Sequence, residues 1–414
     1  MPRIPRWAAW TAAAVLVLAG LVLAAGWLLG RDRARVELET RLTAALGREV
    51  SIAGPVSLAL RPAPALDLEG LAIAGEGGPL LEIGRLTLDA DGAALARGRF
   101  ALGTVRVERP RLRLALDAAG RGSWEAPARA APDGGGAPAW SIERLEIVDG
   151  RVDWRDGRDG TTASLVGLRL GAGPIRLPGT VPFELAVRSV EYGPTRTRVT
   201  ARGSLAVDVA AGEFAARGLA VDAVPERAPA VLGPRPGPLR LAAESVAWSS
   251  RAGRARLDGV ALRGLGLDAR LDGELLRSAA PATAAAAGTA ADAGVTYHFG
   301  GRVGLAPFSP RALLAALGRE APVTQDPAAW TRAALAARIE WSDGALRLRD
   351  VDALLDDSRL RGGATVRIAP ATRWRFDLAV DRLDAERYRE PVDRREAAPV
   401  ELPVDFLRRL DAEG

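Results

Sequence analysis

An alternation of apolar and polar residues with a period of two runs through most of the chain, and this feature most restricts what the chain can fold into. Successive side chains of a strand point to opposite faces, so each run predicts a strand with one apolar face. Glycine, proline and aspartate between the runs supply turns. The helix–strand alternation of a parallel α/β sheet is absent, which predicts a mainly β fold. The alternation is found at Val50/Ile52, Leu58/Leu60, Leu66/Leu68, Leu71/Ile73, Leu86/Leu88, Val105/Val107, Leu112/Leu114/Leu116, Ile142, Leu145/Ile147, Val152/Trp154, Leu165–Leu170, Phe183–Val187, Val199–Val209, Leu239–Leu271, Leu346–Leu348, Thr365–Ile368 and Phe376–Val380.

The run from Trp7 to Gly30 carries no charged residue. As a helix it would reach about 35 Å, enough to cross a hydrocarbon core of roughly 30 Å. Trp7, Trp10 and Trp27 lie near its ends, where interfacial aromatic residues are found. A cleaved signal peptide is the main alternative, but its apolar region is shorter and ends in a small-residue cleavage site. We therefore predict a transmembrane anchor over residues 1–30. Arginines flank both ends of the run, so charge leaves its orientation open.

Three short helices are expected in the remaining chain. Arg35–Leu46 places Val36, Leu38, Leu42 and Leu46 near one face, and a glycine follows as a stop. Ser309-Pro310 and Asp326-Pro327 each put a capping side chain before a proline, which predicts two further helix starts.

Composition and motifs exclude several classes of function. All 56 basic residues are arginine and are interspersed with 51 acidic residues, so the basic stripe of a nucleic-acid-binding protein is absent. The chain has no cysteine and one histidine, His298, which we interpret as structural. Asp356-Asp357 is interpreted as a turn or sheet-edge pair, and the body's tryptophans as core or strand-end residues. We predict no catalytic residue, no metal, no cofactor and no enzymatic activity.

Composition also divides the chain. Residues 126–139 and 279–294 are rich in alanine, glycine and proline, which is typical of a linker and a low-complexity loop. The expected organisation is an anchor (1–30), a helix with a β-sheet (31–125), the linker (126–139), a β-sheet body (140–278), the loop (279–294), a helix-containing β segment (295–392) and a C-terminal tail (393–414).

Two stretches resemble the AsmA family of bacterial envelope proteins. The first comprises LETRLTAALGREVSIAGPVSLALRPAPALDLEGLAI and IGRLTLDADGAALARGRFALGTVRVERPRLRLALDAAGRGSW. The second comprises FSPRALLAALG, PVTQDPAAW, LLDDSRLRGGATV and FDLAVDRLDAERYREPV. Ser123 stands where the family often has asparagine. The end, LPVDFLRRLDAEG, resembles the start of a further β-rich segment, most of which we expect this chain to lack.

The resemblance implies an inner-membrane anchor with the body in the periplasm. It also implies an elongated, curled antiparallel β-sheet that forms a groove, with a few short helices. The implied role is movement of phospholipid between inner and outer membranes and maintenance of the outer membrane, with membrane phospholipids and other envelope proteins as partners. The alternative is a non-enzymatic assembly factor or scaffold for outer-membrane proteins.

An apolar sheet face must be covered, because its exposure costs about 25 cal/mol per Å². It can pack in a closed sandwich or curl around apolar cargo, and the residues leave both open. About fifteen to twenty strands at ~4.8 Å each would make a sheet of roughly 70–100 Å. The candidate groove residues are Val105, Val107, Leu112, Leu114, Leu116, Leu145 and Ile147.

Overall fold

The computed structural model describes the chain in eleven ranges. They are residues 31–60, 64–75, 77–92, 94, 101–125, 141–208, 211–227, 237–279, 295–342, 344–367 and 372–391. The predicted anchor, with Trp7, Trp10 and Trp27, lies outside the described residues, as do the predicted linker, all of the low-complexity loop but Ala279, and the tail. Within the described ranges, no helix combines the length and apolar character needed to span a bilayer.

The described chain is built mainly from strands. Its helical elements are α2 (Arg31–Leu46), α4 (Pro310–Ala316) and the 3₁₀ turn η3 (Glu386–Tyr388). The first strands are β1 (Val50–Ile52), β2 (Val56–Leu60), β3 (Pro64–Gly75), β4 (Gly78–Ala90), β5 (Leu102–Glu108), β6 (Arg111–Leu116), β7 (Ser141–Asp156), β8 (Thr162–Ala172), β9 (Ile175–Arg176) and β10 (Gly179–Tyr192). The others are β11 (Thr195–Asp208), β12 (Glu213–Arg227), β13 (Leu239–Ser249), β14 (Arg254–Gly264), β15 (Leu267–Ala279), β16 (Val295–Phe308), β17 (Ala333–Ser342), β18 (Ala345–Leu355), β19 (Ser358–Arg367) and β20 (Arg373–Val380).

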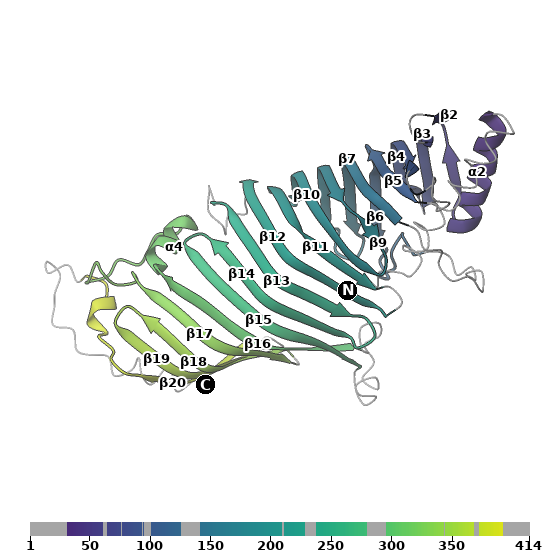
Figure 1. The fold of residues 1–414 in the computed structure, drawn as a ribbon. Helices are drawn as coiled ribbons and strands as arrows, with labels where there is room; N and C mark the ends of the chain where they lie inside the picture. Colours follow the sequence, from purple (N-terminus) through teal and green to yellow (C-terminus); the bar gives the residue numbers. More distant parts are fainter. Residues whose placement is uncertain are drawn as a thin grey trace.

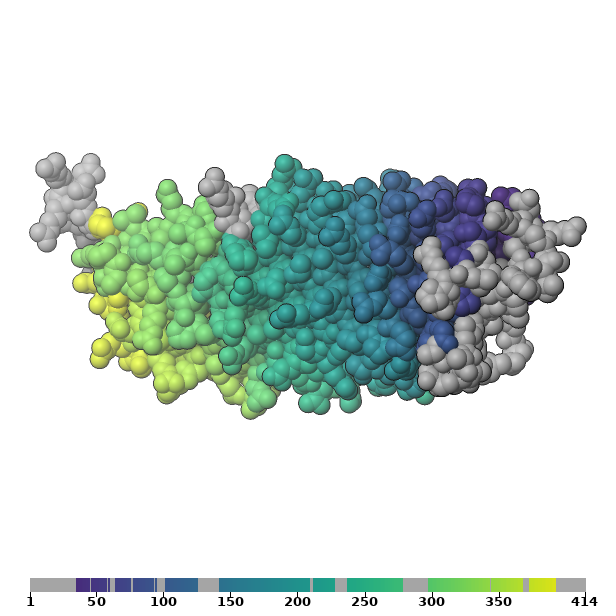
Figure 2. Space-filling model, turned by 45° about the horizontal axis from the view of Figure 1, so that its top comes forward, coloured from purple at the N-terminus to yellow at the C-terminus, as the bar shows by residue number. Residues whose placement is uncertain are grey.

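All 20 described strands belong to one sheet. β1 and β2 pair with the same edge of β3, β5 and β6 with the same edge of β4, and β8 and β9 with the same edge of β7, so the 20 strands form 17 rows. From β10 each strand pairs with the next as far as β20. At ~4.8 Å per row the sheet is about 80 Å long. Figures 1 and 2 show the resulting elongated body, with α2 at one end and β20 at the other.

The predicted mainly β, elongated fold is confirmed, but its description as antiparallel is wrong for one part of the sheet. β5 and β6 run parallel to β7, with Val107 opposite Ile147 and Leu112 opposite Val152. Parallel neighbours need a long crossover. Residues 117–140 separate β6 from β7 in the sequence and supply the necessary length.

A compact core is found where α2 meets the sheet. Leu38 and Leu42 of α2 are 2% and 3% exposed, and they cluster with buried side chains of β1, β3, β4, β5 and β7. Gly47 ends α2 with φ +63°, and its N–H donates to the Thr43 carbonyl, as a C′ glycine does. The helix is confirmed, but the assignment of Val36 to its apolar face is wrong, because that side chain is 54% exposed.

Bulges at non-extended positions keep the apolar side chains on one face. In β18, Leu346 and Leu348 precede Asp350, which has φ +50°, and Val351 and Ala353 follow it. All four face apolar or glycine positions of β19, which alternates without interruption. The bulge therefore absorbs one residue, and bulges of this kind bend and twist a sheet.

One of the two predicted later helices forms. The Ser309 hydroxyl accepts the N–H of Ala312 at 3.2 Å and Pro310 begins α4, as expected. The helix predicted after Asp326 is wrong. Asp326 does accept the N–H of Ala328, but Trp330 then adopts φ +62°, and the following residues become β17, which pairs on both sides. Alternation of Leu335, Ala337, Ile339 and Trp341 outweighs the helix-forming alanines.

Candidate functional site: the apolar face of the sheet

One apolar residue from every row of the sheet lies opposite an apolar residue of the next row. The series results from the strand register and contains no polar or charged member in any of the 17 rows. It comprises Val56, Leu68, Leu86, Val107, Ile147, Leu170, Leu185, Ala201, Val221, Leu241, Leu262, Ala269, Leu305, Leu335, Ala353, Leu360 and Val380. We call this series the central row.

Two further series run alongside the central row, both on the same side of it. One begins at β10 and the other at β11, both end at β20, and they contain only apolar residues and glycine. The nearer one comprises Val181, Leu205, Ala216, Val246, Leu257, Gly273, Gly301, Ile339, Leu348, Ala364 and Phe376. The outer one comprises Val207, Phe214, Trp248, Ala255, Leu275, Phe299, Trp341, Leu346, Val366 and Trp374, and we call it the aromatic rim. The apolar face is therefore several residues wide.

The apolar face is hollowed along its middle. Val187, Ala243, Ala337 and Val351 are each less than 9% exposed, although every described strand belongs to the same sheet and so no second sheet covers them. All four lie on the apolar face of the curled sheet (Figure 1). At one end the core around α2 closes this surface, whereas α4 lies beyond the strand ends (Figure 1). The described part of the chain thus forms a groove-like sheet rather than a sandwich.

The candidate groove residues fall into two groups. Val105 is 7% exposed inside the core around α2, Val107 and Leu145 pack against that core, and Ile147 continues the central row. The other three are on β6. Leu112 lies opposite Val152, Leu114 opposite Trp154, and Leu116 at the strand end opposite Asp156. Leu114 also lines an open hollow of about 740 Å³. Contact of these residues with lipid stays a prediction.

Sequence reasoning did not include the residues of β10–β20 that carry most of the groove, such as Leu185, Leu241 and Leu335. Their alternation was visible, but only the register shows which of them lie side by side. The seven candidates lie in the part of the sheet nearest α2, where helix packing already covers part of the face.

The opposite face of the sheet is a lattice of exposed ion pairs. Arg240 pairs with Asp222 at 3.0 Å and Arg254 with Glu274 at 2.6 Å, in each case across neighbouring strands. Exposed pairs of this kind contribute about 0–1 kcal/mol each, so their main effect is to keep this face solvated. They also explain why 56 arginines produce no basic stripe.

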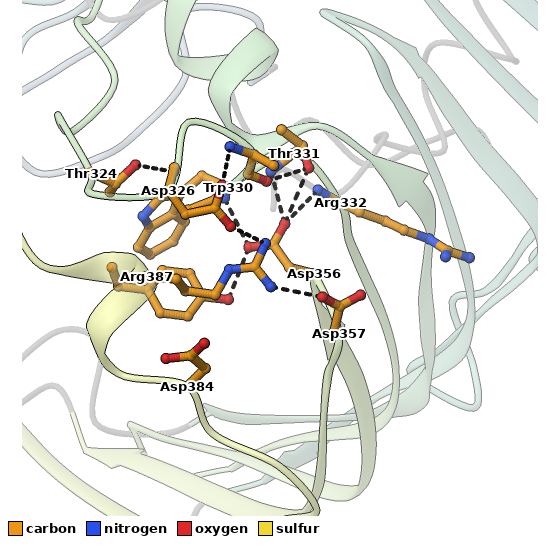
Figure 3. Close-up of polar contacts among 12 residues, drawn as sticks. Thr324, Asp326, Trp330, Thr331, Arg332, Asp356, Asp357, Asp384 and Arg387 are labelled. Carbon is orange, nitrogen blue, oxygen red and sulfur yellow. Dashed lines mark hydrogen bonds and ion pairs between the residues drawn. The ribbon is translucent and has the colours of Figure 1, made fainter.

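A polar cluster fixes the far end of the sheet (Figure 3). Asp356, 6% exposed, forms the β18–β19 turn with φ +51°. Its Oδ1 accepts the N–H groups of Thr331 and Arg332 at 2.9 and 3.1 Å. Its Oδ2 accepts the N–H of Trp330 at 2.8 Å and the hydroxyl of Tyr388 at 2.9 Å. The turn role expected for this residue is confirmed.

The cluster perturbs two ionisations. Burial would raise the pKa of Asp356, but the N–H of Trp330, the hydroxyl of Tyr388 and the N–H groups of Thr331 and Arg332 together lower it. Burial and the bond to Asp356 raise the pKa of Tyr388 to about 12. Arg387 donates to Asp357 at 2.7 Å and pairs with Asp326 at 2.9 Å, so three separate segments are joined. The cluster is a structural tie between the turn before β17, the β18–β19 turn and η3.

His298 lies on β16 opposite Leu276, on the polar face of the sheet. Within the residues that the structure describes, no group of three histidine, aspartate or glutamate side chains is arranged to hold a metal ion.

Comparison with known proteins gives one match. The model of the AsmA family matches residues 1–207, which is half of the 414-residue chain. No curated protein and no solved structure matches the chain. The matched half contains the core around α2 and the first part of the groove-like sheet, where the family resemblance of the sequence begins. The chain belongs to the AsmA family.

Proposed function

We propose that this protein binds phospholipid by its acyl chains along the apolar face of the sheet and moves it between the inner and outer membranes. In this proposal residues 1–30 anchor the chain in the inner membrane and the body lies in the periplasm. The observation that carries the proposal is the central row, which passes through 17 strand rows without a charged residue. Family membership supports an envelope role.

The apolar face of the sheet and the acyl chains of a phospholipid are both surfaces that water solvates poorly. Apolar surface left in water costs about 25 cal/mol per Å², and acyl chains laid on the groove remove that cost on both partners. Contacts between aliphatic chains are non-directional, so no single position on the apolar face holds the acyl chains strongly. Headgroups can stay in water beyond the strand ends while the tails move from row to row. Such movement requires no bond to be made or broken, and thus no nucleophile or cofactor in the described part of the chain.

The test is a charge placed in the groove. Leu241 lies in the central row, and its neighbour Ala242 points to the polar face of the same strand. We expect Leu241→Asp to reduce phospholipid transfer between donor and acceptor vesicles at least tenfold and to deplete co-purified phospholipid in native mass spectra. Ala242→Asp, the matched control, should retain both. Equal transfer by the two variants, or a well-folded wild-type protein that binds no phospholipid, would contradict the proposal.

A second candidate is a non-enzymatic assembly factor, which the last strand favours. β20 pairs only with β19 among the described strands, and its Trp374 and Phe376 are 63% and 61% exposed. An open strand edge with an apolar face can pair with a strand of another protein. A photo-crosslinker at Phe376 tests this. One specific envelope-protein adduct would support the assembly role, and adducts to lipid alone would leave lipid movement as the function.

A further inference from the structure

The end of β15 and the start of β16 place a cation beside an apolar hollow. The two strands pair without a register shift, so their alternation can be followed residue by residue. Leu275 lies opposite Phe299 on the aromatic rim, and one step further out Arg277 lies opposite Tyr297. Arg277 therefore lies on the apolar face of the sheet, in contrast to Arg270, which lies on the polar face of the same strand.

The hollow next to this pair is lined almost entirely by apolar groups. It has a volume of about 460 Å³, and its walls include Leu275, Tyr297, Phe299, Ile339, Trp341 and Leu346. Tyr297 and Trp341 are 38% and 43% exposed, so each lines the hollow and is also in contact with solvent. Aromatic residues of this type are common where an apolar region meets water.

Arg277 is held in place by its backbone and leaves its guanidinium available. Its N–H donates to the carbonyl of Gly253 at 2.7 Å, and no ion pair joins its side chain to another described residue. Neighbouring arginines on the polar face differ: Arg254 pairs with Glu274, and Arg256 pairs with Asp258 at 3.0 Å. Arg277 lies two residues beyond Leu275 and opposite Tyr297, and both of these residues line the hollow. A guanidinium beside an apolar hollow matches a ligand with a phosphate at one end and an aliphatic chain at the other.

We propose that Arg277 and Tyr297 form a headgroup site for a phospholipid, in which the guanidinium and the phenol hydrogen-bond the phosphate and one acyl chain fills the hollow between Phe299 and Trp341. The proposal rests on the lipid-binding function proposed above and adds a fixed orientation to it. Headgroups emerge at the aromatic rim, and tails run along the strands toward the central row. The opposite rim carries no equivalent aromatic series among the described residues of β10–β20.

The experiment distinguishes recognition of the lipid phosphate from recognition of the acyl chains. Binding of fluorescent phosphatidylglycerol and of diacylglycerol with the same acyl chains is measured on the full-length wild type, Arg277→Gln, Tyr297→Phe and Arg270→Gln. Arg270 is a matched control, because it is on the same strand, exposed, and also without an ion pair to a described residue. We expect Arg277→Gln to weaken phosphatidylglycerol binding about tenfold and Tyr297→Phe about threefold, with diacylglycerol binding unchanged; these are typical effects of losing a charged and a neutral hydrogen bond. Arg270→Gln should bind both lipids as the wild type does.

Each contrary outcome has its own meaning. Equal loss of both lipids in Arg277→Gln would assign the residue a structural role and overturn the headgroup site. Unchanged phosphatidylglycerol binding in that variant would also overturn it, while wild-type binding would preserve the proposed function. Wild-type protein that binds neither lipid would refute the proposed function itself. Displacement of phosphatidylglycerol by an equal concentration of inorganic phosphate would indicate a free-phosphate site instead.

Discussion

Replacement of Asp356 by asparagine should release the tie at the far end of the sheet. Both carboxylate oxygens of Asp356 accept hydrogen bonds, two at Oδ1 from Thr331 and Arg332 and two at Oδ2 from Trp330 and Tyr388. Asparagine offers one acceptor oxygen and one amide. With its oxygen kept at Oδ1, its NH₂ meets the N–H of Trp330, which then loses its partner, whereas the Tyr388 hydroxyl can rotate to accept.

The magnitude follows from that single loss. A hydrogen bond to a charged group contributes about 1.5–3 kcal/mol, and a buried donor left unpaired costs a similar amount, so we expect the local opening free energy to fall by about 2–3 kcal/mol. That corresponds to exchange of the amide hydrogens of Trp330, Thr331 and Arg332 about 30- to 150-fold faster, because 1.4 kcal/mol is a factor of ten.

Hydrogen–deuterium exchange followed by mass spectrometry measures this change in the segment that precedes β17. Asp357→Asn is the matched control, because Asp357 is 75% exposed and makes one ion pair with Arg387, which contributes at most about 1 kcal/mol. Exchange in Asp356→Asn that stays within threefold of the wild type would refute the assignment of Asp356 as the centre of the tie.

Two other predictions concern stability. Leu38→Ala should destabilise the core around α2 by about 2–5 kcal/mol, because Leu38 is 2% exposed, with faster hydrogen exchange in β1–β3 but not in β17–β19; Val36→Ala, 54% exposed, should change neither region. The tie should also weaken at both extremes of pH. The lowered pKa of Asp356 gives a contribution present above the ordinary carboxyl pKa of about 3.9 and lost as pH falls through the folded value. The raised pKa of Tyr388 gives one present below pH 10 and lost as pH rises through about 12. Exchange of the amides of residues 329–332 against pH measures both limits, and Tyr388→Phe should abolish the alkaline one.

The sequence predicted the character of this fold better than its details. Alternation in stretches such as Phe183–Val187 correctly indicated strands, because a pleated strand has a strict period of two. Local capping chemistry correctly indicated α4. It failed after Asp326, where the same cap–proline signal precedes a turn, because pairing of β17 with two neighbours outweighs a local preference. The parallel contacts of β7 depend on a crossover, whose return position the sequence does not encode locally.

The candidate site was less accessible to sequence reasoning, and register is the reason. Apolar residues such as Leu241 and Leu262 are 21 positions apart, and only strand pairing shows that they are neighbours. Bulges such as the one at Asp350 change the parity of a strand, so a count of alternating positions from one end assigns the wrong face beyond it. Arg277 is one of 56 arginines in the sequence, and only its pairing with Tyr297 shows that it belongs to the apolar side.

The repetition of the sheet has a consequence for its reach. From β10 onward each hairpin adds two rows, about 10 Å of length, without altering the cross-section, because every new strand contributes one residue to the central row. Insertion or deletion of a whole hairpin therefore changes the length of the sheet in steps of that size. The strands on either side can still pair antiparallel with their new neighbours. Loss of a single strand would instead reverse the direction of all that follow. The hairpin is thus the unit in which a sheet of this kind can be lengthened or shortened.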